Sequence, residues 1–261
     1  MKRTYVKLLT VAGLTGCFLF TSCRSAQDTT ARYEISKVEG NMITIDSTWD
    51  ANPDKKATTV LKPYKDKVDA MMYEVIGTSE MKMDKGTPES LLSNLVASVL
   101  QEAAAQVLGK PADMGLVNMG GLRNILPKGD ITVGAVFEIL PFENSLCVLT
   151  MKGTDMKRLF KAIASLHGEG VSGIRLEINK KGELLNATIG GKPVVDDQLY
   201  TVATIDYLAD GNGRMDAFLQ AEKRECPEDA TLRGLFLDYV RKQTAEGKII
   251  TSKLDGRITV K

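Results

Sequence analysis

Histidine is nearly absent from this sequence, and its scarcity limits the chemistry that the chain can perform. The 261 residues contain one histidine, His167, in a glycine-rich turn. A two-metal hydrolase site needs several imidazoles and carboxylates that converge on ions a few ångström apart, which one histidine cannot supply. The HExxH, paired CxxC, GxxxxGK(S/T) and GxSxG patterns are also missing, and no carboxylates are spaced for a metal. We therefore expect no catalytic residue and no metal ligand in this chain, and we interpret His167 as a solvated turn residue.

The chain also lacks an excess of charge of either sign. It has 34 basic and 33 acidic residues, a formal net charge of +1, and no block of like charge. Binding of a nucleic acid polymer needs a basic surface, so this class of partner is not expected. Hydrophobic residues make up 43% of the sequence, which suits one globular domain of roughly 200 residues with a core.

The N-terminus has the pattern of an export signal. A basic start precedes an apolar stretch, residues 8–20, which is too short to span a bilayer comfortably and leads to Cys23. This pattern predicts a lipoprotein signal peptide over residues 1–22, lipidation of Cys23, and a polar tether over residues 23–32. Cleavage before Cys17 matches the lipobox consensus even better but would shorten the apolar core. An ordinary secretory signal or an uncleaved anchor is the other interpretation.

The expected location follows from the same segment. Acyl chains on Cys23 would hold the protein to a membrane surface without a spanning helix. Within the tether only Asp28 is acidic. We therefore expect a lipid-anchored protein of the cell envelope, on the outer membrane and facing the periplasm.

The remaining cysteines, Cys147 and Cys226, lie far apart and form no CxxC pair. Cys147 belongs to an apolar run that is typical of a strand. Two free, partly buried cysteines are favoured over a disulfide, although export would bring the chain to an oxidising compartment.

Hydrophobic periodicity predicts hairpins mixed with helices. A hairpin and a loop are expected over residues 33–62, with strands near 33–38 and 42–46. A helix over residues 63–76 would turn one stripe toward the core, formed by Val68, Met71, Met72 and Val75. A longer helix is expected to begin with Thr87 as its N-cap and Pro88 at its first position, and its apolar stripe runs to residue 107.

Shorter elements alternate along the rest of the chain. Strands are expected over residues 115–117, 145–151, 174–178, 184–189, 199–205 and 257–260. Helices are expected over residues 132–140, 154–166 and 228–244. Because hairpins and helices are interleaved, the fold class predicted is α+β, with mixed or antiparallel sheets and packed helices, in a main domain over residues 63–261.

One loop could carry a ligand site. A buried strand ends at Asn118, and the chain then continues through Gly120 and Gly121 to Arg123. The two glycines permit a tight turn and a close approach of a ligand to the backbone. The amide of Asn118 and the guanidinium of Arg123 offer hydrogen bonds and charge. Taken alone, such a loop is either a ligand site or an ordinary turn.

Further segments follow this loop in a specific order. They are Leu126–Thr132, Leu140–Asn144, Lys152–Gly153, Tyr200–Thr204, Asp206–Gly211 and Asp255–Ile258. In order and spacing the series resembles the C-terminal domain of 5′-nucleotidases and UDP-sugar hydrolases, from about Pro63 to the C-terminus. The resemblance implies the α+β fold of that domain.

The resemblance also implies roles for several residues. Phe142 and Tyr207 match two aromatic rings that sandwich a nucleobase in this family. Asn118 matches a residue that hydrogen-bonds the base, and Arg123 matches an arginine directed at ribose or phosphate. With Gly120 and Gly121, these residues are the substrate-binding site that the resemblance implies.

The sequence departs from the family pattern in two places within this site. Gly213 stands where an aspartate usually holds the ribose hydroxyls, and Asp210 or Asp216 is the nearest substitute. Pro88 and Gly86 stand where an arginine is usual, and Lys85 could reach the same place.

Intact members of the family also carry an N-terminal metallophosphoesterase domain with histidine-rich metal motifs, which this sequence does not contain. The resemblance therefore implies a nucleotide-recognition domain that acts in nucleotide catabolism with a separate metallophosphoesterase chain. Divalent metals would belong to that partner, and no cofactor is expected here. Two alternatives stay open: a non-enzymatic nucleoside- or nucleotide-binding envelope lipoprotein, and an interaction module with an inactive pocket.

Overall fold

The computed structural model describes residues 35–261, of which Lys55–Lys261 form one compact unit. The expected signal peptide over residues 1–22, Cys23 and the tether over residues 23–32 lie outside the described residues.

The expected N-terminal hairpin is not formed in the part that the structure describes. Residues 35–46 contain no strand, and all of their side chains are exposed. A two-stranded hairpin with no buried face is only marginally stable in water. The alternation of apolar and polar residues was therefore not enough to predict strands here. A short 3-10 helix, η1 (Ser47–Ala51), follows, and Asp46 caps it by accepting a hydrogen bond from the Thr48 N–H at 2.9 Å.

Helix α2 (Lys55–Met72) begins earlier and ends sooner than the sequence predicted. The expected boundary between residues 62 and 63 falls inside it. Val68 and Met71, which we assigned to the core, are 47% and 59% exposed, whereas Met72 packs partly against the core. Periodicity identified an amphipathic helix, but it does not say what covers the apolar face.

The other helices are short and lie between strands. They are α3 (Leu91–Ala103), α4 (Ala105–Leu108), α5 (Val133–Ile139), α6 (Gly153–Ser165), α7 (Asp206–Ala209) and α8 (Leu232–Ala245), with 3-10 helices η2 (Met119–Gly121), η3 (Asn212–Arg214) and η4 (Asp216–Gln220). The cap predicted at Thr132 is confirmed, because its side chain accepts a hydrogen bond from the Ala135 N–H at 3.1 Å.

Three sheets organise the described chain. The strands are β1 (Val75–Ser79), β2 (Met114–Val117), β3 (Gly129–Thr132), β4 (Leu146–Lys152), β5 (Gly170–Ser172), β6 (Ile174–Ile178), β7 (Leu184–Ile189), β8 (Lys192–Pro193), β9 (Leu199–Ile205), β10 (Lys223–Glu225) and β11 (Ile258–Val260). The central sheet has the order β10-β4-β9-β2-β5, the second has the order β11-β6-β7-β8, and β1 pairs with β3. Most pairs are antiparallel, but β2–β9 and β11–β6 are parallel. The α+β class with mixed sheets is confirmed.

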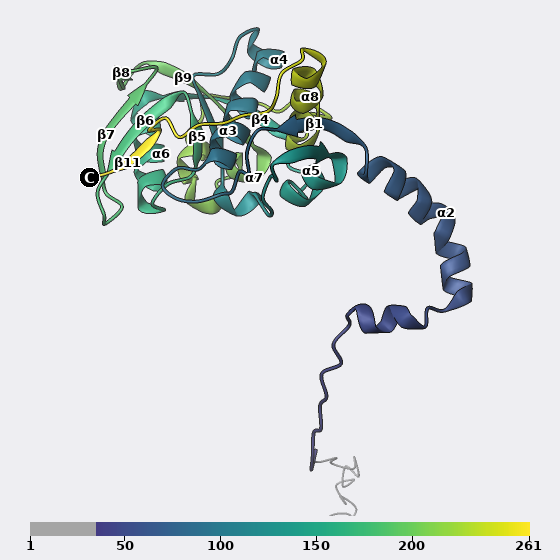
Figure 1. Cartoon of the computed structure of the whole chain (residues 1–261). Helices are drawn as coiled ribbons and strands as arrows, with labels where there is room; N and C mark the ends of the chain where they lie inside the picture. Colours follow the sequence, from purple (N-terminus) through teal and green to yellow (C-terminus); the bar gives the residue numbers. More distant parts are fainter. Residues whose placement is uncertain (1–34) are drawn as a thin grey trace, which may run out of the picture. The chain divides into compact units, whose positions relative to one another are not determined.

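Helix α3 supplies much of the core. Its N-cap is Ser90, whose hydroxyl accepts a hydrogen bond from the Ser93 N–H at 3.3 Å, and not Thr87 as expected. The predicted apolar stripe is confirmed, because Leu92, Val96 and Leu100 are fully buried. The helix packs against β2 and β5 of the central sheet and against α8. Figure 1 labels α3, β5 and α8. Helix α3 therefore fixes the strand that leads into the candidate ligand loop.

Cys147 and Cys226 form a disulfide, so the expectation of two free thiols was wrong. Strand β10 pairs with β4 so that Glu225 lies opposite Val148. This register brings Cys226 beside Cys147, with their Cα atoms 4.2 Å apart. The pairing joins segments separated by 79 residues, and no spacing in the sequence reveals it.

Candidate functional site

A cavity of about 360 Å³ lies where three loops meet at one edge of the central sheet. Strands β2 and β9 are parallel neighbours, so the loops that follow them leave the sheet at the same edge. Strand β4 is antiparallel to β9, with Leu146 opposite Ile205, so the loop before β4 reaches that edge too. The residues that line the cavity are Asn118, Gly120, Gly121, Phe142, Asn144 and Tyr207.

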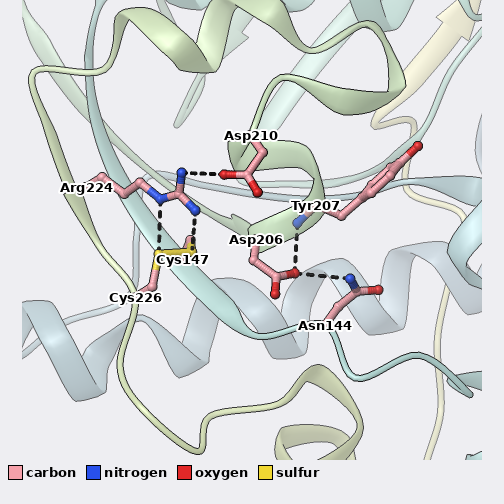
Figure 2. The surroundings of a disulfide bond; sticks show 7 residues. All are labelled: Asn144, Cys147, Asp206, Tyr207, Asp210, Arg224 and Cys226. Atoms are coloured by element: carbon pink, nitrogen blue, oxygen red, sulfur yellow. Dashed lines mark hydrogen bonds and ion pairs between the residues drawn. A yellow bond between two sulfur atoms is a disulfide. The ribbon is translucent and has the colours of Figure 1, made fainter.

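Two aromatic rings from different loops line this cavity. Phe142 is 49% exposed and Tyr207 is 44% exposed, so neither ring is used to fill the core. The carboxylate of Asp206 ties their loops together. It accepts hydrogen bonds from the Tyr207 N–H at 2.8 Å and from Asn144 Nδ2 at 3.0 Å (Figure 2). These bonds link the loop that carries Phe142 to the loop that carries Tyr207.

Asn118 presents an amide to the cavity that the protein itself does not use. Its Oδ1 atom is buried and has no hydrogen-bond partner among the described residues. A Cβ atom at Gly121 would lie 3.0 Å from this oxygen, so the glycine leaves the space in which the amide sits. An unsatisfied buried acceptor costs about 1–3 kcal/mol, and a donor on a bound molecule would remove that cost.

Arg123 lies beside the loop but is not among the residues that line the cavity. It is exposed, and its guanidinium donates a hydrogen bond to the Gly120 carbonyl at 3.2 Å. Lys85, the suggested replacement for a missing arginine, donates to the carbonyl of Leu122 on the same loop. The cationic groups of Arg123 and Lys85 therefore contact the backbone of this loop but do not line the cavity.

Asp210 is likewise not a lining residue. Its carboxylate forms an ion pair with Arg224 at 2.6 Å, and Arg224 in turn contacts the sulfur atoms of the disulfide (Figure 2). Gly213 lies next to the aromatic ring, because a Cβ atom built on it would lie 3.8 Å from Tyr207 Cε1. Asp216 is exposed in η4.

The sequence analysis missed two residues of this region. Asn144 lines the cavity. In the sequence, only its position two residues after Phe142 indicates that it could belong to the site. Glu169 accepts a hydrogen bond from the N–H of Met119, 50 residues away, and only the fold brings them together. Burial raises the pKa of the Glu169 carboxyl, and the bond from Met119 opposes that rise.

Within residues 35–261, no group of three or more histidine, cysteine, aspartate or glutamate side chains could hold a metal ion. His167 is exposed in a turn with a φ of 59°, as expected for a solvated turn residue. The site is therefore an aromatic and amide surface, with cations at its border, that suits recognition of a flat polar ring.

Comparison with known proteins identifies the family of this chain. The sequence model of the "5′-nucleotidase, C-terminal domain" family matches residues 75–220, more than half of the chain. Endonuclease YhcR of Bacillus subtilis is 28% identical over 188 residues, covering 69% of this chain and 15% of that protein. The trifunctional nucleotide phosphoesterase YfkN of the same organism is 27% identical over 238 residues, covering 84% of this chain and 16% of that protein.

Solved structures show the same fold. The 5′-nucleotidase precursor of Thermus thermophilus superposes with a TM-score of 0.67 at 26% identity, covering 81% of this chain and 44% of that one. The NAD nucleotidase of Haemophilus influenzae shares the fold, with a TM-score of 0.59 at 20% identity, covering 80% of this chain and 42% of that one. The chain thus spans less than half the length of these relatives. By its family match and its fold, the chain belongs to the 5′-nucleotidase C-terminal domain family.

Proposed function

We propose that this chain is the nucleotide-recognising component of a 5′-nucleotidase-type system and holds a nucleobase between Phe142 and Tyr207. One observation carries the proposal: two half-exposed rings from separate loops line a single cavity of about 360 Å³. Stacking of a base on an aromatic ring contributes about 1–3 kcal/mol and tolerates different bases. A flat ring placed between the two side chains would cover both of them.

Polar groups around the rings complete the proposed site. The unpartnered Oδ1 of Asn118 would accept a hydrogen bond from a ring N–H or an exocyclic amine of the base. The backbone at Gly120 and Gly121 allows the ligand to approach closely. Arg123 would meet a phosphate at the border of the cavity. Asp210 pairs with Arg224 through Oδ1, so its second carboxylate oxygen is the one that would accept from a ribose hydroxyl.

We assign hydrolysis to a separate metallophosphoesterase chain, which would bring the divalent metals. The relative YfkN is named as a trifunctional nucleotide phosphoesterase, and this chain covers 16% of that protein. The described residues offer no cluster of metal ligands. In this proposal the recognition domain and the metal-bearing chain act together in nucleotide catabolism.

Calorimetry with AMP, adenosine and UDP-glucose tests the recognition step. Phe142→Ala and Tyr207→Ala are each expected to weaken binding by about 10- to 100-fold, the equivalent of one lost stacking contact. Leu185→Ala is the control, because Leu185 is 55% exposed in β7 of the other sheet. If the wild type and both variants bind all three ligands equally poorly, the pocket is inactive and the chain is an interaction module.

A mixing experiment tests the partner. A metallophosphoesterase encoded beside this gene is purified and assayed for AMP hydrolysis with and without this chain. We expect a gain in hydrolysis that Tyr207→Ala abolishes. Tight nucleotide binding without any gain would instead identify a non-enzymatic binding protein of the envelope.

We also propose that the protein is lipid-anchored through Cys23 on the outer membrane and faces the periplasm. The leader pattern supports this location, as does the disulfide, because disulfides persist in oxidising compartments. The cell wall protein Lmo0130 of Listeria monocytogenes is 27% identical over 240 residues. Labelling with radioactive palmitate should mark the wild type, and Cys23→Ala should abolish the label.

A further inference from the structure

Glu169 reaches the wall of the cavity from a distant part of the chain. It lies in the turn between α6 and β5, and its carboxylate accepts a hydrogen bond from the backbone N–H of Met119. Met119 begins η2, and its neighbours Asn118, Gly120 and Gly121 all line the cavity. One carboxylate therefore holds the backbone segment from which half of the lining residues come.

The turn that carries Glu169 is itself fixed on both sides. Gly168 has a φ of +118°, which favours glycine, and a Cβ atom there would lie 2.3 Å from the Pro88 carbonyl oxygen. On the other side, Gly170 pairs with Val117 in the β2–β5 ladder. Because both neighbours are locked, Glu169 is held in register with the end of β2, just before Asn118.

Asn118 does not use its side chain to cap η2. Asparagine is a preferred N-cap residue, because its side-chain oxygen satisfies a free N–H at the start of a helix. Asn118 is the N-cap of η2 but makes no side-chain capping bond, and its Oδ1 stays unpartnered. Glu169 accepts from the N–H of Met119 at the first position of η2, while the side-chain oxygen of Asn118 bonds to no N–H of η2 and is available to a ligand.

We propose that Glu169 is a positioning residue, which holds η2 so that the Asn118 amide faces the bound base. The inference rests on the proposed nucleotide-binding function but concerns a residue outside the cavity lining. It explains why a partly buried carboxylate, which forms no ion pair among the described residues, lies behind this loop.

The test compares Glu169→Ala with Glu169→Gln. Alanine removes the acceptor, so adenosine and AMP should bind about tenfold more weakly. Glutamine keeps a side-chain oxygen that can accept from Met119, so binding should stay within about threefold of the wild type. Exposed Glu228→Ala controls for loss of charge, and Ile178→Val, buried in the second sheet, controls for loss of stability without a change at the cavity.

A second measurement does not depend on a ligand. Amide hydrogen exchange at Met119 and Gly121, whose N–H groups are both hydrogen-bonded, should quicken in Glu169→Ala and stay slow in Glu169→Gln and Ile178→Val. Unchanged affinity and unchanged exchange in Glu169→Ala would overturn the inference. If the wild type binds no nucleotide, the exchange data still decide whether Glu169 holds the loop, so failure of the proposed function is distinguished from failure of this inference.

Discussion

At the scale of single residues, the proposed site is defined by groups that the fold leaves unused. Phe142 and Tyr207 keep about half of their surface exposed, and Asn118 Oδ1 has no partner among the described residues. Burying a polar atom without a hydrogen bond is costly, so a fold retains such an arrangement where a ligand satisfies it. The same residues would be poor choices for stability alone.

Glu169 should make stability depend on pH in a defined direction. Burial raises the pKa of its carboxyl in the folded protein above the ordinary value of 4.5. As pH rises past that value, the unfolded chain loses this proton before the folded chain does, so the wild type loses stability relative to Glu169→Gln. The Tm of Glu169→Gln minus that of the wild type should therefore increase as the pH rises above 4.5 and level off once the pH exceeds the raised pKa of the folded protein. A difference that stays constant across this range would contradict the prediction.

At the scale of elements, the contact between α3 and β2 determines where the candidate ligand loop, residues 118–123, begins. A Cβ atom at Gly115 would lie 2.3 Å from the Ala97 carbonyl oxygen and 2.5 Å from Ser172 Oγ. The Ser172 hydroxyl already donates to that carbonyl at 2.9 Å. Helix and strand are thus packed backbone to backbone, which only glycine permits.

Gly115→Ala should therefore lower the free energy of unfolding by about 1–3 kcal/mol, because the helix and the strand must move apart. Urea unfolding measures the change. Gly86→Ala is the matched control, since a Cβ atom there meets nothing within 4 Å. Equal midpoints for the two variants would show that α3 and β2 can separate without cost.

The disulfide is the second element-scale feature, because it fastens the short edge strand β10 to β4. Closing a loop of this length removes entropy from the unfolded chain, which is worth about 4 kcal/mol in the chain-entropy model. Reductant should lower the unfolding midpoint of the wild type toward that of a Cys147→Ala/Cys226→Ala variant. It should leave the variant itself unchanged. A wild type that is insensitive to complete reduction would contradict this prediction.

At the scale of the whole molecule, all buried side chains of the described chain lie in residues 55–261, so these residues provide its stability. Every residue from 35 to 54 is exposed, so this segment buries no side chain of its own. A chain that begins at residue 55 should have a Tm within about 2 °C of that of a chain that begins at residue 35, with the same nucleotide affinity. Thermal unfolding and calorimetry on the shortened chain would check both expectations, and a large drop in Tm would show that the segment packs against the rest.

Patterns with a short range were predicted well from the sequence. The apolar stripe of α3, the Thr132 cap and the β6–β7 hairpin depend on residues close together in the chain, and all three are present. The N-cap of α3 lies three residues later than expected, at Ser90. Helix ends depend on which side chain accepts the first free N–H groups, and several residues could do so here.

The sequence by itself determined the class of fold, the strand-to-loop transition at Asn118 and the order of segments that marks the family. Only the tertiary structure decided that Cys147 bonds to Cys226, that Glu169 binds the backbone of the candidate ligand loop, and that Asp210 pairs with Arg224. The pairing of Phe142 with Tyr207 was implied by the family resemblance, and the structure places both rings at one cavity. The physical reason is the same in each case. Strand pairing joins segments that lie tens of residues apart, and periodicity along the chain carries no information about that register.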